Sequence, residues 1–304
     1  MIGWHAMSGY RLPPKVPNTG LAVASLVVVS TVAALGMSIP NVAQPLISDD
    51  FEVSVSATQW VSLSYLLLSS LLMVPAGRLA DSVGRVKVLL GGIAIFTLMS
   101  LFSGLANSLP LLAIARGGMG IGGAAMTALP VALVRQTVAP DRVGRTMGVI
   151  GSAMAAGWAL GPAAGGMLAA VAGWRLAFLA LVPLGIAALA MVAKALPTRQ
   201  GGTGLALETD LLGSAVLALA LVSYSVGLTL RPFGWVGTVS LVSLGVASLV
   251  AFVFVELRVS SPLVDFRLLA RVRVYPGLIT AFLASTIMMS FTVIQPFYLA
   301  RGLE

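Results

Sequence analysis

Apolar residues run continuously through most of the chain, in stretches of about twenty residues that are separated by short polar segments. A helix needs roughly 20 apolar residues to cross the hydrocarbon core of a bilayer. Apolar and polar residues do not alternate with a period of two, as they would in a transmembrane barrel. The pattern therefore predicts an all-α polytopic membrane protein with nine transmembrane helices. The predicted spans are residues 20–47, 57–76, 87–106, 109–134, 145–171, 174–195, 210–230, 235–255 and 275–299.

The composition agrees with a bilayer protein and excludes several kinds of site. Of the 304 residues, 58% are hydrophobic and 9% are charged, whereas about a quarter of the residues in a soluble domain are charged. The absence of cysteine excludes disulfides, thiol catalysis and cysteine-bound metals. The single histidine, His5, excludes a histidine metal cluster or catalytic triad. The sequence has no nucleotide-binding loop, which disfavours an ATP-driven pump, and we expect no enzymatic activity and no cofactor.

The basic residues predict the orientation in the membrane. If the N-terminus is cytoplasmic, fourteen of the eighteen Lys and Arg residues lie in cytoplasmic segments, three lie outside and Arg116 lies within a span. The positive-inside rule therefore predicts a cytoplasmic N-terminus, in the plasma (inner) membrane of a bacterium. The net charge of +8 reflects this excess rather than a nucleic-acid partner. The first apolar run is long and lacks an A-x-A site, so we expect no cleavable signal peptide.

Charged residues cluster between the second and third spans, in the sequence GRLADSVGRVKVLLGG at residues 77–92. One interpretation is topological anchoring, for which Lys and Arg suffice. Anchoring does not account for Asp81, which is flanked by Gly77 and Gly84. Glycine permits a tight turn, and an aspartate before a helix caps it. The second interpretation is therefore a turn with a defined shape.

The fifth span is rich in small residues and reads GRTMGVIGSAMAAGWALGPAAGGMLAAV. Small residues four apart let membrane helices approach closely, and Pro162 is expected to kink the helix because it lacks an N–H. The pattern fits either plain tight packing or a kinked helix at a moving interface. One ridge comprises Gly144, Gly148, Ser152 and Ala156, and another comprises Gly157, Gly161 and Gly165, followed by Gly166.

Five residues are candidates for binding a substrate. Arg116 lies about seven residues inside the outer end of the fourth span, where a charge is costly and usually functional. Snorkelling of its side chain to the outer surface is the alternative. Asn41 and Gln44 are polar residues in the proline-containing part of the first span. Trp60 and Tyr65 lie near the outer end of the second span, where an interfacial aromatic belt is the competing interpretation.

Several of these segments resemble motifs of the major facilitator superfamily. GRLADSVGRVKVLL resembles the family's loop between helices two and three, written G-x-L-a-D-r-x-G-r-k. LLAIARGGMGIGGAA is similar to the helix-four motif R-x-x-q-G-x-g-a-A, with Met119 in place of Gln, and GWALGPAAGG is similar to the exporter motif G-x-x-x-G-P-x-x-G-G. GWRLAF and ELRVSSPLVDFRLLARVRV further resemble the fourteen-helix drug:proton antiporter branch (EmrB/QacA-like).

The resemblance implies an architecture of two six-helix bundles that rock around a site near the membrane midplane. About five helices of that fold would be missing here, so we expect a fragment that needs the missing C-terminal bundle for activity. The implied division is a cytoplasmic tail (1–19), a six-helix bundle (20–195), a cytoplasmic linker (196–209), two inserted helices (210–257), a basic cytoplasmic loop (258–274) and the first helix of an incomplete second bundle (275–304).

The resemblance also implies a role for the charged turn. In the family, the aspartate at the position of Asp81 faces the second bundle and latches the outward-open state. Asp141, near the inner end of the fourth span, is a candidate partner for Arg85. The residues implied to shape the turn are Gly77, Arg78, Gly84 and Arg85.

One departure from the antiporter branch concerns proton coupling. That branch often has an aspartate in L-D-x-T-i-v-N-v-A-l-P, whereas the first span here reads AALGMSIPNVAQPLI and has Gly36 at this position. No Asp or Glu lies inside the first six predicted spans. A proton-coupled carrier needs a titratable group within the membrane. That group is therefore Glu208 or Asp210, lies in the missing half, or does not exist.

Three functions remain open on these grounds. The first is a secondary transporter that exports amphipathic or cationic small organic compounds, such as drugs, by alternating access with proton antiport. The second is a metabolite exporter or facilitator without proton coupling, in which Arg116 binds an anionic group. The third is an inert, truncated membrane remnant. The expected partners are a small-molecule substrate, protons and the lipid bilayer.

Overall fold

The computed structural model describes residues 18–198, 211–229, 234–259, 276–277, 279–280 and 282–287. Within these ranges the regular secondary structure is entirely helical, as the sequence predicts. The helices are α1 (Thr19–Asp50), α2 (Val55–Val83), α3 (Arg85–Gly104), α4 (Leu109–Thr137), the 3₁₀ helix η2 (Pro140–Arg142), α5 (Val143–Ala172), α6 (Trp174–Leu179), α7 (Leu181–Ala195), α8 (Leu211–Thr229) and α9 (Gly234–Glu256).

Seven helical segments in the described part of the chain are long and apolar enough to cross a membrane, and the prediction of a polytopic all-α membrane protein is confirmed. The sixth predicted span is divided into α6 and α7, because Pro183 has no N–H to donate to the carbonyl of Leu179. The two predicted spans that follow correspond to α8 and α9. The ninth, residues 275–299, lies mostly outside the described residues, and the parts of it that are described are helical.

Short-range contacts explain where several helices begin and end. The Asn18 side chain accepts a hydrogen bond from the backbone N–H of Leu21 (3.0 Å) and caps α1. The Ser54 side chain caps α2 in the same way. Gly84 separates α2 from α3 with a φ of 114°. This backbone conformation strains any residue that has a Cβ, so glycine is required for the tight turn.

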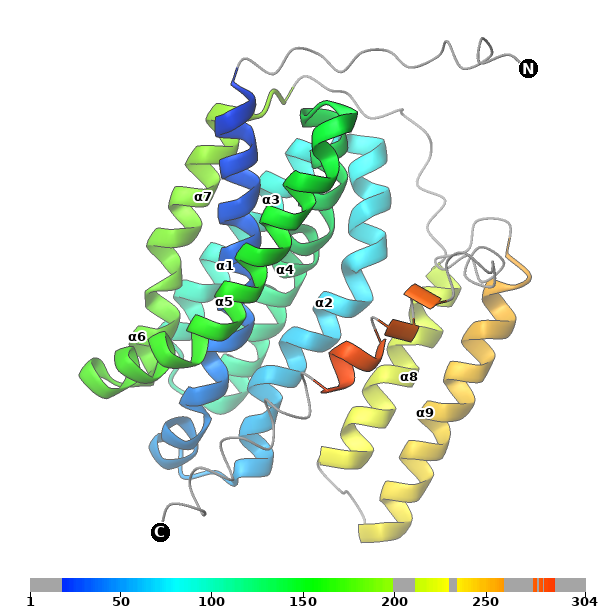
Figure 1. Ribbon diagram of the computed structural model, residues 1–304. Coiled ribbons are helices and arrows are strands. Elements are labelled where there is room, and N and C mark those ends of the chain that lie inside the picture. Colours follow the sequence, from blue (N-terminus) through cyan, green and yellow to red (C-terminus); the bar gives the residue numbers. More distant parts are fainter. Residues whose placement is uncertain are drawn as a thin grey trace.

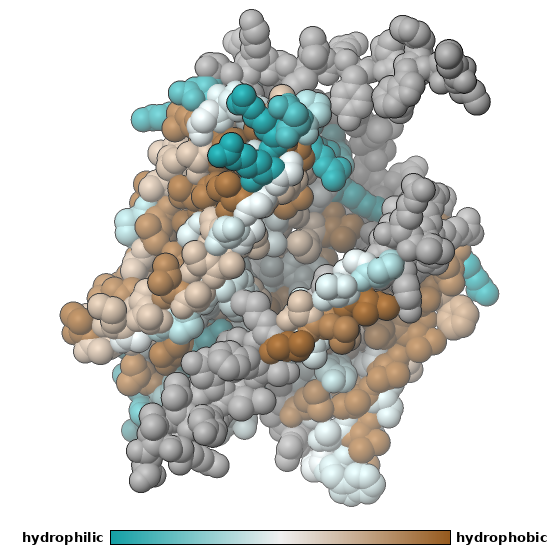
Figure 2. Space-filling view, viewed as in Figure 1, coloured by the Kyte–Doolittle hydropathy of each residue, from teal (hydrophilic) through white to brown (hydrophobic). Residues whose placement is uncertain are grey.

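Helix α1 lies at the centre of the bundle and packs on α5, α7, α2 and α4 (Figure 1). Helix α4 packs between α2 and α3, while α8 and α9 pair with each other beside α2. Figure 2 shows hydrophobic residues along the sides of the helices and hydrophilic residues gathered at the end where α5 begins. This distribution is the one expected of helices whose sides face lipid. The largest fully buried apolar side chains include Leu26, Ile93, Phe96, Leu112, Met126 and Phe178.

A cluster of polar contacts joins distant segments at the end of the bundle where α1 ends. The Asp50 carboxylate accepts hydrogen bonds from Trp174 Nε1 (3.1 Å) and Arg175 Nη1 (2.9 Å). The Arg175 guanidinium stacks on the Trp174 ring, 4.3 Å from its centroid, and also donates to the carbonyl of Ala106 (3.3 Å). These contacts tie the end of α1 to the start of α6 and to the turn before α4.

Candidate functional site

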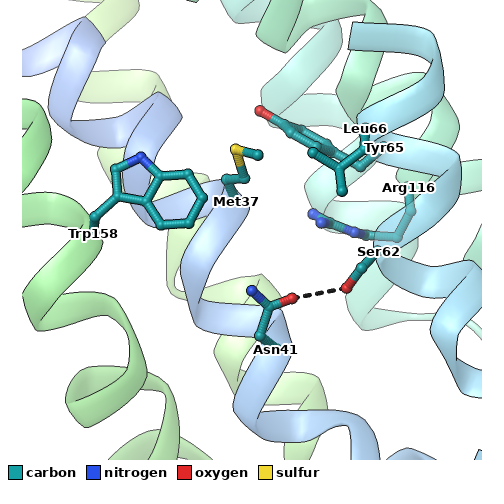
Figure 3. Close-up of a pocket in the computed structure, with 7 residues that line it drawn as sticks. All are labelled: Met37, Asn41, Ser62, Tyr65, Leu66, Arg116 and Trp158. Atoms are coloured by element: carbon teal, nitrogen blue, oxygen red, sulfur yellow. Dashed lines mark hydrogen bonds between the residues drawn. The ribbon is translucent and has the colours of Figure 1, made fainter. Parts of the chain in front are cut away.

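A small pocket of about 20 Å³ lies between four helices of the bundle. A cavity needs about 10–15 Å³ to hold one water molecule, so this pocket has room for about one water molecule or one small polar group. Figure 3 shows side chains from α1, α2, α4 and α5 facing one another around it. The lining residues are Met37, Asn41, Ser62, Tyr65, Leu66, Arg116 and Trp158.

Arg116 is the only lining residue that carries a charge. Its side chain is 1% exposed, which excludes snorkelling to the surface. Nε donates to the carbonyl of Val61 (3.0 Å) and Nη1 donates to the carbonyl of Gly36 (2.9 Å). The guanidinium also stacks on the Tyr65 ring, 4.6 Å from its centroid. Neutral carbonyls and aromatic faces thus hold a full positive charge inside the bundle.

Glycines of α4 bring α2 close enough for these contacts. A Cβ on Gly117 would lie 2.9 Å from a methyl carbon of Leu68, and a Cβ on Gly120 would lie 2.5 Å from the carbonyl oxygen of Tyr65. Small residues allow helix backbones to approach to this extent. The glycine-rich run after Arg116 therefore places the α2 backbone within reach of the guanidinium.

No carboxylate compensates the charge of Arg116 within the described residues, where its partners are carbonyls, rings and a thioether sulfur. The acidic side chains of the described ranges lie at the helix ends and turns instead. They are Asp49, Asp50, Glu52, Asp81, Asp141 and Glu256.

A chain of hydrogen bonds links the polar residues beside Arg116. Gln44 Nε2 donates to the hydroxyl oxygen of Ser62 (2.9 Å), and the Ser62 hydroxyl donates to Asn41 Oδ1 (2.8 Å), as Figure 3 shows for the second bond. A hydroxyl has one proton to donate. The bond from Gln44 therefore directs the Ser62 proton to the Asn41 carbonyl oxygen and leaves the Asn41 amide N–H groups toward the pocket.

The structure brings together three of the five residues that the sequence proposed for a substrate cavity. Asn41, Tyr65 and Arg116 line the pocket, and Gln44 contacts it through Ser62. Trp60 does not line it; the indole N–H is buried and has no acceptor among the residues that the structure describes.

Four lining residues escaped the sequence analysis: Met37, Ser62, Leu66 and Trp158. Trp158 had a usable signal, since it is the one large aromatic residue among the small residues of the fifth span. The other three resemble many residues of their helices and had none.

The charged turn between α2 and α3 contains an ion pair. Asp81 Oδ1 accepts hydrogen bonds from Arg85 Nη2 (2.8 Å) and Nε (3.0 Å), and Arg85 Nη1 also donates to the carbonyl of Ala132 (3.4 Å). The suggested pairing of Arg85 with Asp141 is wrong in this structure. The turn at Gly84 keeps Asp81 one helical turn before Arg85, so the Arg85 guanidinium pairs with the Asp81 carboxylate, which lies nearer than that of Asp141.

The other residues assigned to this region are placed as follows. Asp81 is 59% exposed, and Asp141 lies on the exposed 3₁₀ helix η2. Gly77 and Arg78 are half-buried on α2, and a Cβ on Gly77 would contact nothing within 4 Å. No steric contact therefore requires a glycine at position 77 in this structure.

One of the two small-residue ridges of α5 packs directly on α1. A Cβ on Gly157 would lie 2.9 Å from the Ala34 Cβ, a Cβ on Gly165 would lie 2.7 Å from the Ile39 carbonyl oxygen, and a Cβ on Gly161 would overlap Ser38. Gly166 makes only an ordinary contact, and α5 continues as a helix through the half-buried Pro162.

The other ridge of α5, which begins at Gly144, does not pack on a neighbouring helix in the described structure. Gly144 and Gly148 have no atom within 4 Å of an added Cβ, and Ser152 and Ala156 are exposed. Only the ridge of Gly157, Gly161 and Gly165 is therefore a packing surface in the described structure.

The sequence pattern of the Major Facilitator Superfamily matches residues 26–303, which is nearly the whole chain. The chain belongs to this superfamily. The match includes the pocket, the charged turn and α5.

Two curated relatives extend the comparison to named proteins. The chain is 30% identical over 306 residues to the multidrug resistance protein B homolog of Mycobacterium tuberculosis (strain CDC 1551 / Oshkosh), covering 98% of this chain and 56% of that protein. It is 33% identical over 263 residues to the cephamycin export protein CmcT of Amycolatopsis lactamdurans, covering 84% of this chain and 54% of that protein. The chain thus spans about half the length of the curated relatives that it matches.

A solved structure supports the fold. This chain is similar to a bacterial homologue of the human lysosomal transporter Spinster, whose structure was solved in an inward-facing, occupied conformation. The TM-score is 0.53 and the sequence identity is 21%. The similarity covers 80% of this chain and 62% of that one. At this identity the comparison supports the major facilitator fold and nothing more specific.

Proposed function

We propose that this chain forms the substrate-binding half of a secondary transporter that exports small amphipathic organic compounds by alternating access. The observation that carries the proposal is the pocket between α1, α2, α4 and α5, which combines aromatic walls with a buried arginine. A transmembrane charge is costly and is usually kept for a functional reason. The names of the two relatives, a multidrug resistance protein homolog and an export protein, favour export.

The transport cycle is proposed to need a second six-helix bundle. A carrier of this fold moves two bundles around a shared site, and the relatives are nearly twice as long as the part that this chain matches. In that cycle Asp81 latches one conformation by contacting the second bundle, and its pair with Arg85 orients the carboxylate. The face of α5 that carries Gly144 and Gly148 is unobstructed and suits such a moving contact.

Proton antiport is proposed as the energy source, with the titratable group outside residues 20–195. The membrane-embedded parts of α1 to α7 contain no carboxylate in the described structure. Glu208 and Asp210 are candidates from the sequence and lie outside the described residues. Glu256, which the sequence analysis did not consider, is 3% exposed at the end of α9 and is a third candidate. A second candidate function is a metabolite exporter or facilitator without proton coupling, which the absence of acidic residues from the membrane-embedded parts of α1 to α7 favours.

The orientation is proposed to be that of the positive-inside rule, with the N-terminus in the cytoplasm and the chain in the plasma (inner) membrane. The turns at residues 77–87 and 135–145 are then cytoplasmic. The hydrophilic surface where α5 begins supports this assignment, since Arg142 and Arg145 are exposed there.

An efflux assay tests the proposed function. The chain is expressed in an efflux-deficient bacterium, both alone and fused to the C-terminal part of the Mycobacterium relative. We expect the fusion to lower the steady-state accumulation of several amphipathic dyes and antibiotics, and a protonophore to abolish the effect. Trp158→Ala in the pocket should abolish export, while Val171→Ala, on a residue that is 84% exposed, should not. A correctly inserted fusion that changes the accumulation of no compound would refute the proposal.

A further inference from the structure

We propose that the pocket binds an anionic group, such as a carboxylate, of an aromatic substrate, and that Arg116 and Asn41 select for this charge. The inference rests on the proposed function, because it takes the pocket as part of the substrate site. The preferred substrates are then anionic amphipathic compounds rather than cationic ones.

The first observation is the uncompensated charge. Arg116 is almost completely buried and lines the pocket, and its contacts in the described structure are carbonyls, aromatic rings and a sulfur atom. A buried charge is ordinarily paired, but no carboxylate of the described residues reaches this one. A cationic ligand in the same pocket would be repelled at close range, whereas an anionic ligand would supply the missing partner.

The second observation is the supply of hydrogen-bond donors. A guanidinium has five N–H donors. Nε and Nη1 of Arg116 donate to the carbonyls of Val61 and Gly36, while Nη2 donates to no atom of the described residues. In Figure 3 the end of the guanidinium points between Tyr65 and Asn41, toward Met37. Nη1 also contacts the Met119 sulfur (3.6 Å), so the donors that lack an acceptor are the N–H groups of Nη2.

The third observation is the polarity of the Asn41 amide. Ser62 Oγ accepts from Gln44 Nε2 and donates its own proton to Asn41 Oδ1, so the oxygen of this amide already accepts a hydrogen bond and its nitrogen remains. Asn41 Nδ2 donates to no group in the described part of the chain, and in Figure 3 it lies on the side toward Trp158 and Met37. Two elements, α1 and α4, thus present only N–H donors to one space. Donors without acceptors match a carboxylate, which accepts through both oxygens.

The walls of the pocket complete the proposed ligand. Tyr65 and Trp158 supply ring faces, and Met37 and Leu66 supply apolar contacts. The volume of about 20 Å³ has room for only a small polar group, so the anionic group would occupy the pocket and the ring next to it would extend out of the pocket beside Tyr65 and Trp158. The ligand class is therefore an aromatic carboxylate or a larger compound that carries one.

A binding experiment on the purified chain in nanodiscs of neutral lipid tests this inference. The probes are 1-naphthoate and 1-naphthylmethylammonium, which share a ring system and differ in charge. Isothermal titration calorimetry measures both affinities. We expect naphthoate to bind at least tenfold more tightly than the ammonium compound.

Asn41→Asp replaces the amide by a carboxylate of the same shape. We expect it to weaken naphthoate binding at least tenfold and to reduce the preference for the anion to nearly nothing. The control is Asn107→Asp, which adds the same charge at an exposed residue between α3 and α4 and should leave both affinities unchanged. Far-UV circular dichroism of each variant verifies that the helices are retained.

The outcomes separate this inference from the proposed function. Equal binding of both probes, tighter binding of the ammonium compound, or binding of neither probe would overturn the anion site, even if the fusion exports other compounds. If naphthoate binds selectively but the fusion exports nothing, the anion site stands and the proposed function fails. Selective binding that Asn41→Asp leaves intact would overturn the assignment to this pocket.

Discussion

The contact between α1 and α5 offers a sharp test of the packing. Gly161 lies against Ser38, so that an added Cβ would overlap the Ser38 hydroxyl and lie 2.7 Å from its Cβ. The Ser38 hydroxyl donates to the carbonyl of Ala34 (2.9 Å) within α1 and lies 3.2 Å from the carbonyl of Gly157 across the interface. Gly161→Ala therefore requires either a displaced serine or a separation of the two helices.

The expected cost follows from these contacts. Overpacking a tight interface by one methyl group costs about 1–3 kcal/mol, and loss of the hydrogen bond across the interface costs about 0.5–1.5 kcal/mol. The higher helix propensity of alanine offsets at most about 1 kcal/mol. We expect Gly161→Ala to destabilise the bundle by about 1–3 kcal/mol. The matched control is Gly148→Ala on the same helix, where an added Cβ contacts nothing within 4 Å; it should be neutral or slightly stabilising.

The assay is SDS-induced unfolding in detergent micelles, followed by far-UV circular dichroism. Gly161→Ala should unfold at a lower SDS fraction than wild type, and Gly148→Ala should not. Adding Ser38→Gly to Gly161→Ala removes the overlapping atoms and should recover part of the loss. Coincident unfolding curves for wild type and Gly161→Ala would refute the packing argument, and a failure of Ser38→Gly to recover stability would show that the cost arises elsewhere.

Three further predictions concern coupling, gating and orientation. Gly36→Asp places a carboxylate in α1, but its Cβ would overlap the Phe96 ring. We therefore expect a destabilised protein in the SDS assay and a recovery when Phe96→Ala is added; an undiminished stability of the single variant would contradict the overlap. Asp81→Asn removes an exposed ion pair whose contribution to stability is below about 1 kcal/mol. SDS unfolding should therefore change little, while efflux by the fusion should fall severalfold. Efflux at the wild-type rate would leave anchoring as the role of this turn. Single cysteines at Ser82 and Asn107 of this cysteine-free chain should be shielded and labelled, respectively, by an impermeant thiol reagent in intact cells; the reverse pattern would invert the topology.

The sequence alone predicted the membrane class and the positions of the first eight spans, and its motifs indicated the superfamily. Apolar runs of transmembrane length report where a helix can lie in a bilayer, because the cost of an exposed backbone in lipid leaves few alternatives. The same reasoning identified Arg116 as a functional candidate, since a charge at that depth needs partners. Gly84 was also readable, because a charged residue pattern broken by glycine predicts a turn, and its φ of 114° bears this out.

The tertiary structure decided which of these residues meet. Periodicity shows two equivalent ridges on the fifth span, but only the packing of α5 on α1 shows that Gly161 faces a neighbour and Gly148 does not. Trp158 joins the pocket and Trp60 does not, although both are tryptophans in apolar helices. The spacing of residues along one helix defines its faces, whereas the rotation of that helix against its neighbours depends on side chains from several distant segments. The pocket around Arg116, with its N–H donors, forms only when α1, α2, α4 and α5 are each rotated so that these side chains face one another.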